Sequence, residues 1–144
     1  MSFAVDANLL LYASDSSSPR RDRATELLHR LAEGPELVYL FWPVVVAYLR
    51  LGTHSSVFEQ PLSTEAAREN ITALLRLPHV RSPGELEGFW PVLERACAEG
   101  VVRGNLVSDA HLVALMRQHG VSTIWTSDRD FRRFEGIVAR DPFG

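Results

Sequence analysis

The sequence predicts an α/β fold, a three-layer α/β/α domain with a mostly parallel central sheet of four to five strands. Short apolar runs typical of strands alternate with helical patterns along the chain, and this alternation indicates a parallel sheet covered by helices on both faces. The length of 144 residues suits one compact domain, residues 1–144. A hydrophobic content of 46% with 23% charged residues is typical of a globular protein.

The first part of the chain predicts two strands and three helices. In the second helix, apolar residues recur at the i, i+3, i+4, i+7 spacing of one face, and Gly34 ends the helix. Pro43 suits the first turn of the third helix, where its missing N–H costs nothing. The expected order is a strand (2–5), a short helix to Leu11, a loop (14–19), a helix (20–33), a strand (37–41), a helix (44–51) and a loop (52–61).

The second part of the chain predicts three helical segments and three strands. Ser63 and Ser108 suit the N-caps of two of the helices, and Gly120 ends the last one. Pro91 falls within a helical composition, which predicts a kink or a new helix start there. The expected order is a helix (64–77), a short strand (79–81), a helical segment (85–99), a helix (109–119) and two strands (121–126 and 137–140).

The charge composition excludes several chemistries. The chain has 15 Arg and no Lys, and its net charge is −3. It therefore lacks the lysine of a P-loop, of a Schiff base and of a phospho-acceptor receiver domain. The acidic balance does not favour nucleic-acid binding, nor does it exclude it. Two arginine clusters, 20/21/23 and 129/132/133, are either basic contact points or solvated helix faces.

Membrane insertion and cysteine chemistry are not expected. No apolar stretch approaches the roughly 18 residues that span a bilayer. The sequence does not contain a basic segment followed by a long apolar run, which would indicate a targeting signal. We therefore expect a cytoplasmic protein. Cys97 is the only cysteine, which excludes an internal disulfide and a cysteine metal cluster, and its helical setting favours a small core residue.

Four aspartates each follow a run that should be buried: Asp6, Asp109, Asp128 and Asp130. Asp6 and Asp128 come just after predicted strands, and Asp109 lies in the first turn of a predicted helix. Because sites in such sheets form beyond the carboxyl ends of the strands, the fold can bring these residues together. Buried carboxylates are costly unless hydrogen-bonded or paired with a cation, so the set predicts a shared metal site. Taken singly, each aspartate is also explained by capping or turn formation.

Three segments carry these aspartates: Val5-Asp-Ala-Asn-Leu-Leu-Leu-Tyr12, Asn105-Leu-Val-Ser-Asp-Ala-His-Leu112 and Thr126-Ser-Asp-Arg-Asp-Phe131. In order and spacing they resemble the PIN-domain nucleases, specifically the VapC toxins of bacterial toxin–antitoxin pairs. The resemblance runs essentially from end to end. It implies a PIN-like parallel sheet flanked by helices, and an activity in which acidic residues hold Mg²⁺ or Mn²⁺ and cleave RNA. It also implies that Asp6 and Asp109 are the principal ligands, Asp128 the third, and Asp130 a helper or alternate ligand.

The resemblance is incomplete in one segment. Many family members carry a Glu in a pattern like Ala-Glu-Leu-Leu-Arg, whereas Val46-Ala47-Tyr48-Leu49-Arg50 stands here, with Ala47 at the Glu position. The surrounding residues, 42–54 with 57–58, look like a VapC subgroup without this Glu. Either Asp130 replaces it, or the metal keeps an additional water, which Mg²⁺ tolerates, or the domain is degenerate and inactive.

Carboxylate-held metal ions can activate a water and stabilise the departing oxygen without Ser, Cys or His as nucleophile. All four aspartates are therefore candidate catalytic and metal-binding residues of a ribonuclease. Arg129 or a nearby Arg is a candidate for holding substrate phosphate. Ser108 and Ser127 either orient a carboxylate or water or act as caps, and Asn8 either bonds Asp6 or caps a short helix.

Other candidate sites are weaker. His54, His111 and His119 are too scattered for a zinc signature. No Gly-x-Ser-x-Gly elbow is present. The tryptophans adjoin apolar neighbours, which predicts core or interface residues rather than base-stacking platforms: Trp42, Trp90 and Trp125.

The expected function is therefore a metal-dependent endoribonuclease that cleaves cellular RNA such as tRNA or rRNA and arrests translation. The resemblance implies that its partners are the RNA, a VapB-like antitoxin and a second copy in a homodimer. The apolar residues of the early helices and of residues 42–58 indicate either a covered surface of this kind or a well-filled core. The alternative is a degenerate PIN fold that binds RNA or protein without cutting. A haloacid-dehalogenase phosphatase fits less well, because it needs a lysine and an Asp where Asn8 stands.

Overall fold

The computed structural model describes residues 2–144 and contains one five-stranded sheet in that range. All the strand pairings are parallel, and the spatial order is β3-β2-β1-β4-β5. Ala4 lies opposite Tyr39 on one side and Ile124 on the other, so β1 is the central strand. The predicted parallel sheet is confirmed. The strands are β1 (Ser2–Val5), β2 (Leu37–Tyr39), β3 (Val80–Arg81), β4 (Thr123–Trp125) and β5 (Val138–Arg140).

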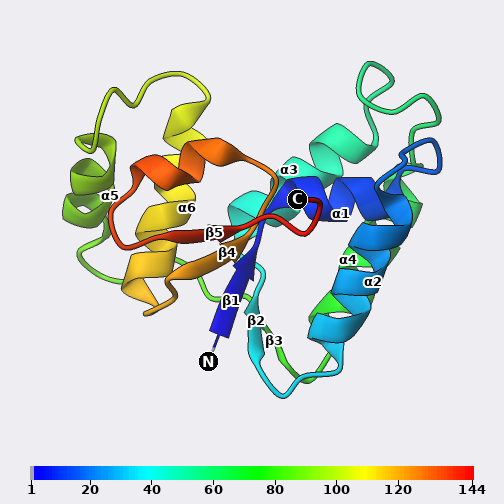
Figure 1. Ribbon diagram of the computed structural model, residues 1–144, viewed down its shortest axis with the longest axis horizontal. Coiled ribbons are helices and arrows are strands. Elements are labelled where there is room, and N and C mark those ends of the chain that lie inside the picture. Colours follow the sequence, from blue (N-terminus) through cyan, green and yellow to red (C-terminus); the bar gives the residue numbers. More distant parts are fainter. Residues whose placement is uncertain (1) are drawn as a thin grey trace.

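Helices lie on both sides of this sheet, which gives the predicted three layers. Figure 1 shows α2 and α4 on one side of the strands and α5 and α6 on the other. The helices are α1 (Ala7–Ser14), α2 (Arg21–Ala32), α3 (Trp42–Gly52), α4 (Thr64–Leu75), α5 (Phe89–Cys97), α6 (Leu106–Gln118) and the 3₁₀ helix η1 (Arg129–Arg133). No helix in the described part of the chain is long and apolar enough to cross a membrane.

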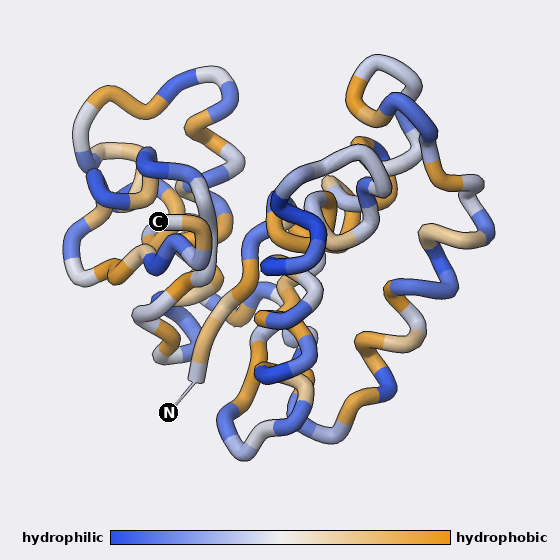
Figure 2. The backbone as a smooth tube through the Cα atoms, turned by 45° about the vertical axis from the view of Figure 1, so that its right-hand side comes forward, coloured by the Kyte–Doolittle hydropathy of each residue, from blue (hydrophilic) through white to orange (hydrophobic). Residues whose placement is uncertain are grey.

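The core forms where the helices pack on the central strand. The tube of Figure 2 shows the N-terminal strand as an apolar segment that runs through the middle of the molecule. Its residues Ala4 and Val5 are buried against side chains of α1, α3 and α6, such as Leu9, Phe41 at the start of α3, and Val113. A buried parallel strand reads as a continuous apolar run, as Ser2–Val5 does.

The start of α6 differs from the prediction. The helix begins at Leu106, after Gly104 in a positive-φ conformation, and its N-cap Asn105 makes no side-chain cap bond. The prediction that Ser108 caps this helix is therefore wrong. The additional turn places the partly exposed Leu106 at the i position of the face on which Ala110 and Val113 are buried. Ser108 lies inside the first turn, next to Asp109.

The prediction of a new helix start near Pro91 is confirmed, because α5 begins at Phe89 and Pro91 lies in its first turn. The preceding residues 85–88 are not helical, contrary to the predicted segment 85–99. The helix η1 was not predicted from the sequence. It is one short turn, too brief to leave a periodic apolar pattern.

Two of the three tryptophans are not core residues. Trp42 is 44% exposed and Trp90 is 66% exposed, so of the two predicted roles the core role is wrong for both, and the interface role stays a prediction. Trp125 is partly buried and packs edge-on against Phe3, with ring centroids 6.2 Å apart.

Candidate active site

The predicted acidic residues gather where the strand order reverses. The chain leaves β1 toward β2 and β3 on one side and returns through β4 and β5 on the other. Asp6 directly follows β1, and Thr126 directly follows its neighbour β4. The gap between two such strand ends is the usual binding crevice of an open parallel sheet.

Asp6 is the centre of a hydrogen-bond network. Its Oδ1 accepts from the backbone N–H of Ala7 at 2.7 Å and thereby caps α1. Its Oδ2 accepts from Thr126 Oγ1 at 2.8 Å and from Asn8 Nδ2 at 3.3 Å. Burial raises the pKa of Asp6, and these hydrogen bonds from Thr126 and Ala7 oppose the rise. Asp6 is thus both a capping residue and a buried charge at the crevice.

Thr126 links this network to the second acidic segment. Its Oγ1 accepts from Asn8 Nδ2 at 3.1 Å and from the backbone N–H of Asp128 at 2.9 Å. Asp128 Oδ1 in turn accepts from the backbone N–H of Asp130 at 2.8 Å and caps η1. Thr126 was missed as a site residue. The sequence signal for Thr126 was a hydroxyl residue between a buried strand and an aspartate. Many turns share this pattern, so it did not single out Thr126.

Asp109 reaches the same place from α6. Burial, together with the charges of Asp128, Asp6 and Asp130, raises the pKa of Asp109 to about 7. One carboxylate oxygen from each of Asp109, Asp128 and Asp130 lies within 4.8 Å of the other two. Asp6 does not belong to this close set, because its oxygens are directed to Thr126, Asn8 and Ala7.

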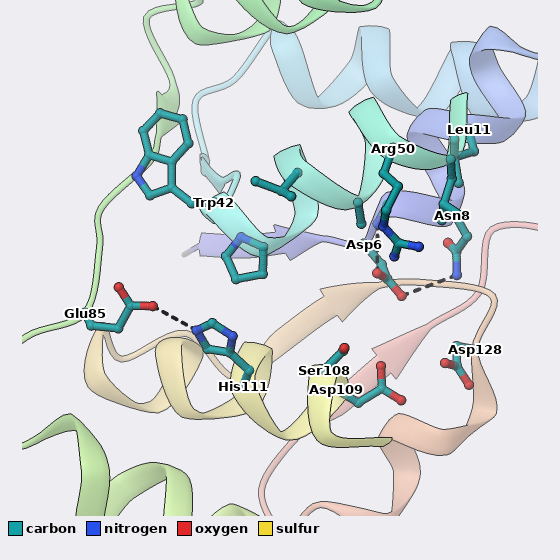
Figure 3. Close-up of a pocket in the computed structure, with 15 residues that line it drawn as sticks. Asp6, Asn8, Leu11, Trp42, Arg50, Glu85, Ser108, Asp109, His111 and Asp128 are labelled. Carbon is teal, nitrogen blue, oxygen red and sulfur yellow. Dashed lines mark hydrogen bonds and ion pairs between the residues drawn. The ribbon is translucent and has the colours of Figure 1, made fainter. Parts of the chain in front are cut away.

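A cleft of about 640 Å³ runs between α3 and α6 over these residues. Figure 3 shows Asp6, Asp109 and Asp128 together at one end of it. Asp130 is not part of the lining, and it also lies 3.5 Å from the guanidinium of Arg133. Ala47, at the position of the missing Glu, lines the α3 wall. The aspartates thus form two overlapping sets. Asp6, Asp109 and Asp128 line the cleft, and Asp109, Asp128 and Asp130 have closely spaced oxygens.

Other predicted residues fall in different places. Arg129, the predicted phosphate-binding candidate, does not line the cleft, whereas Arg50, which was not predicted, does. Its signal in the sequence was its i+3 spacing from Ala47, which places both on one face of α3. Ser108 lines the cleft, whereas Ser127 contributes a backbone N–H to Asn8 Oδ1 at 3.4 Å.

The histidines do not form a metal site within residues 2–144. His54 bonds Ser56, and His119 bonds the carbonyl of Gly84. His111 lines the cleft and donates from Nε2 to Glu85 Oε1 at 2.8 Å. No sequence pattern connects His111 with Glu85, which lies on a segment between β3 and α5.

The model of the PIN domain family matches residues 3–137. The chain is 53% identical over 143 residues to Ribonuclease VapC48 of Mycobacterium tuberculosis, with 99% of each chain covered. It is 34% identical over 133 residues to Ribonuclease VapC37 of the same organism, with 92% of each covered. The solved structure of VapBC-1 from nontypeable Haemophilus influenzae superposes with a TM-score of 0.70 over all of both chains at 13% identity. The protein therefore belongs to the PIN-domain family, in its VapC group.

Proposed function

We propose that the protein is a metal-dependent endoribonuclease, the toxin of a toxin–antitoxin pair, and that residues 1–144 form a single PIN-like domain. The observation that carries the proposal is the convergence of aspartates from three segments: Asp6, Asp109 and Asp128 line one end of the cleft, and Asp130 lies beside the last two. The ribonuclease names of the relatives support the same activity.

The donor set fits a divalent cation. Hard oxygen ligands from several carboxylates are what Mg²⁺ and Mn²⁺ prefer, and the close oxygens of Asp109, Asp128 and Asp130 offer three of them. The raised pKa of Asp109 shows that its charge is poorly compensated by protein groups alone. A cation at this place would relieve the repulsion among these carboxylates.

The protein's own groups have separable roles. Asp109 would hold the cation from α6 and Asp128 from the start of η1, and Asp130 would add a ligand from η1 itself. Asp6 would complete the negative field, in an orientation fixed by Thr126 and the start of α1. A bound divalent ion would supply Lewis acidity toward the attacking water and the departing oxygen.

Arg50 would bind substrate phosphate from the α3 wall. Figure 3 shows its side chain extending from α3 into the same end of the cleft as Asp6. It forms no ion pair within the described residues, so its charge is available to a ligand. Because Ala47 replaces the usual Glu three residues earlier, this wall carries a positive charge without an adjacent carboxylate.

The partners proposed are an RNA substrate, a VapB-like antitoxin and a second copy of the chain. The structural neighbour from Haemophilus influenzae is a VapBC pair, which supports the antitoxin. Exposed apolar side chains between residues 42 and 58 support a covering partner, since Trp42, Val46 and Val57 are 44%, 59% and 45% exposed. Light scattering and co-purification with the antitoxin test these two partners separately.

The competing function is a degenerate PIN fold that binds RNA or protein without cutting, and the observation that favours it is Ala47 in the cleft wall. The test is cleavage of tRNA and rRNA by antitoxin-free protein with Mg²⁺ or Mn²⁺, and with EDTA as control. Metal-dependent cleavage, with growth arrest on expression, supports the nuclease. Metal binding without cleavage or growth arrest supports the binding module.

A further inference from the structure

The cleft extends beyond the aspartates to a second group of polar and aromatic side chains. Figure 3 shows Trp42 on the α3 wall, and Glu85 with His111 on the α6 wall, at the end away from Asp128. None of these three residues has a part in holding the cation. Ser108 and His111 lie one turn apart on α6, so this second group is continuous with the acidic end.

The Glu85–His111 pair is held in one geometry. His111 donates from Nε2 to Glu85 Oε1 at 2.8 Å, and its ring packs edge-on against Phe89 with centroids 5.6 Å apart. This hydrogen bond lowers the pKa of Glu85, so the carboxylate stays charged at neutral pH. The Glu85 side chain is 45% exposed and keeps further acceptor capacity toward the cleft.

The backbone around Glu85 is fixed independently of its side chain. His119 Nε2 bonds the Gly84 carbonyl at 2.8 Å. Gln118 accepts from the Leu86 N–H at 2.9 Å and donates to the Leu86 carbonyl at 3.2 Å. The segment is thus held on both sides of Glu85, and an exposed Glu–His pair adds little to stability. The carboxylate is preorganised without being needed for the fold.

A fixed carboxylate is unsuited to a phosphate neighbour in a cleft that accepts RNA, because the two charges repel. It is suited to the N–H groups of a base edge. Guanine presents two such donors side by side, N1–H and the exocyclic amine, which match the two oxygens of one carboxylate. The exposed indole of Trp42 offers an apolar face on which an unpaired base can stack.

We propose that Trp42, Glu85 and His111 form a nucleobase subsite that selects guanine in a single-stranded segment of the RNA, within three nucleotides of the cut. The proposal rests on the ribonuclease function proposed above. Glu85 accepts from the guanine edge, His111 orients Glu85, and Trp42 stacks on the base. For Trp42 this reverses the sequence-based expectation that the tryptophans do not serve as stacking platforms.

The test replaces, one at a time, each guanosine within three nucleotides of the mapped cut by inosine, which lacks the exocyclic amine. At one position the wild-type kcat/KM should fall about tenfold or more, the worth of one hydrogen bond to a charged group. In Glu85→Gln the ratio of kcat/KM for the guanosine substrate to kcat/KM for the inosine substrate should be about one. The substitution removes one of the two carboxylate oxygens that accept from the guanine edge. Glu87→Gln is the matched control, because Glu87 belongs to the same segment and does not line the cleft. A ratio unchanged in Glu85→Gln, or near one in the wild type, overturns the proposal.

A binding measurement separates this proposal from the nuclease function. Fluorescein-labelled trinucleotides with central guanosine, inosine, adenosine or uridine are titrated into Asp109→Asn protein with Mg²⁺. Guanosine should bind tightest, and the preference should vanish with Glu85→Gln. Trp42→Ala should weaken binding, whereas Trp90→Ala, which removes an exposed indole outside the cleft, should not. If the four trinucleotides bind equally well, the guanine subsite is overturned even if the protein cuts RNA. If the guanosine trinucleotide binds tightest, the subsite is supported even if the protein cuts no RNA.

Discussion

Thr126 Oγ1 donates a hydrogen bond of 2.8 Å to Asp6 Oδ2 and so joins two residues that are 120 positions apart in the sequence. The bond connects the ends of the neighbouring parallel strands β1 and β4 at the point where the sheet order reverses. The same oxygen accepts from Asn8 and from the backbone of Asp128. One buried hydroxyl therefore sets the relative positions of Asp6 and Asp128.

Thr126→Val should destabilise the protein by about 1–3 kcal/mol, because it keeps the shape and leaves buried polar partners unsatisfied. Thr126 is only 2% exposed, so water cannot easily replace the hydroxyl. Urea unfolding measures the loss. Thr123→Val is the control, because Thr123 is buried at the start of β4, the strand that leads to Thr126, and takes no part in this network. Equal effects of the two substitutions would argue against a special role for Thr126.

Without metal, stability should fall as the pH rises from about 4 to about 7. The pKa of Asp109 is raised from 3.8 to about 7, so across this window the folded state binds a proton that the unfolded state has released. The loss should be on the order of 2 kcal/mol after solvent screening, with a plateau above pH 7. Urea unfolding at pH 5 and pH 8 measures it. Asp109→Asn should flatten the profile, and an unchanged fall in that variant would place its origin elsewhere.

Mg²⁺ or Mn²⁺ should raise the melting temperature relative to EDTA, because ligands that bind only the folded state stabilise it by mass action, by about 2.7 kcal/mol at 100 times Kd. The shift should be larger at pH 8 than at pH 5, since a proton on Asp109 competes with the cation. Asp109→Asn should lose most of the shift. No shift in the wild type, together with no heat of metal binding in calorimetry, would refute the metal site.

Asp130→Asn tests whether Asp130 or a water molecule takes the coordination position of the missing Glu. If a water takes it, the substitution should lower the metal affinity only slightly. We expect instead at least a ten- to hundredfold loss of metal affinity, because Asp130 has an oxygen within 4.8 Å of those of Asp109 and Asp128. Calorimetric titration with Mn²⁺ measures it. Arg133→Gln is the control, since it removes the 3.5 Å contact to Asp130 and keeps the carboxylate.

The sheet could be predicted from the sequence because its strands are short apolar runs separated by helices with clear periodicity. The ends of helices were harder to predict where two local sequence signals compete. A serine before an aspartate resembles a cap, yet α6 begins two residues earlier, after Gly104 in a positive-φ conformation, and leaves Ser108 inside the helix. The helix η1 has no periodic pattern to detect.

The acidic residues of the site could also be proposed from the sequence, because Asp6 and Asp128 follow strand-like apolar runs and Asp109 stands near the start of a periodic helix. Their division into two overlapping sets could not, since it depends on which oxygen Thr126 and Asn8 occupy. The partnership of Glu85 with His111 joins positions 26 residues apart through a non-helical segment. No spacing rule links such positions, and only the tertiary fold brings them together.

The most direct test of the account compares RNA cleavage by the wild type, Asp6→Asn and Asp15→Asn, each freed of antitoxin, with Mn²⁺ present. Asp6→Asn should lose cleavage and still fold cooperatively, because its Oδ1 keeps the cap to Ala7, although its amide nitrogen no longer accepts from Thr126 and Asn8. Asp15→Asn alters an exposed carboxylate that bonds Ser17 outside the cleft, and it should cleave like the wild type. Cleavage that survives in folded Asp6→Asn protein would contradict a catalytic centre at this cluster of aspartates.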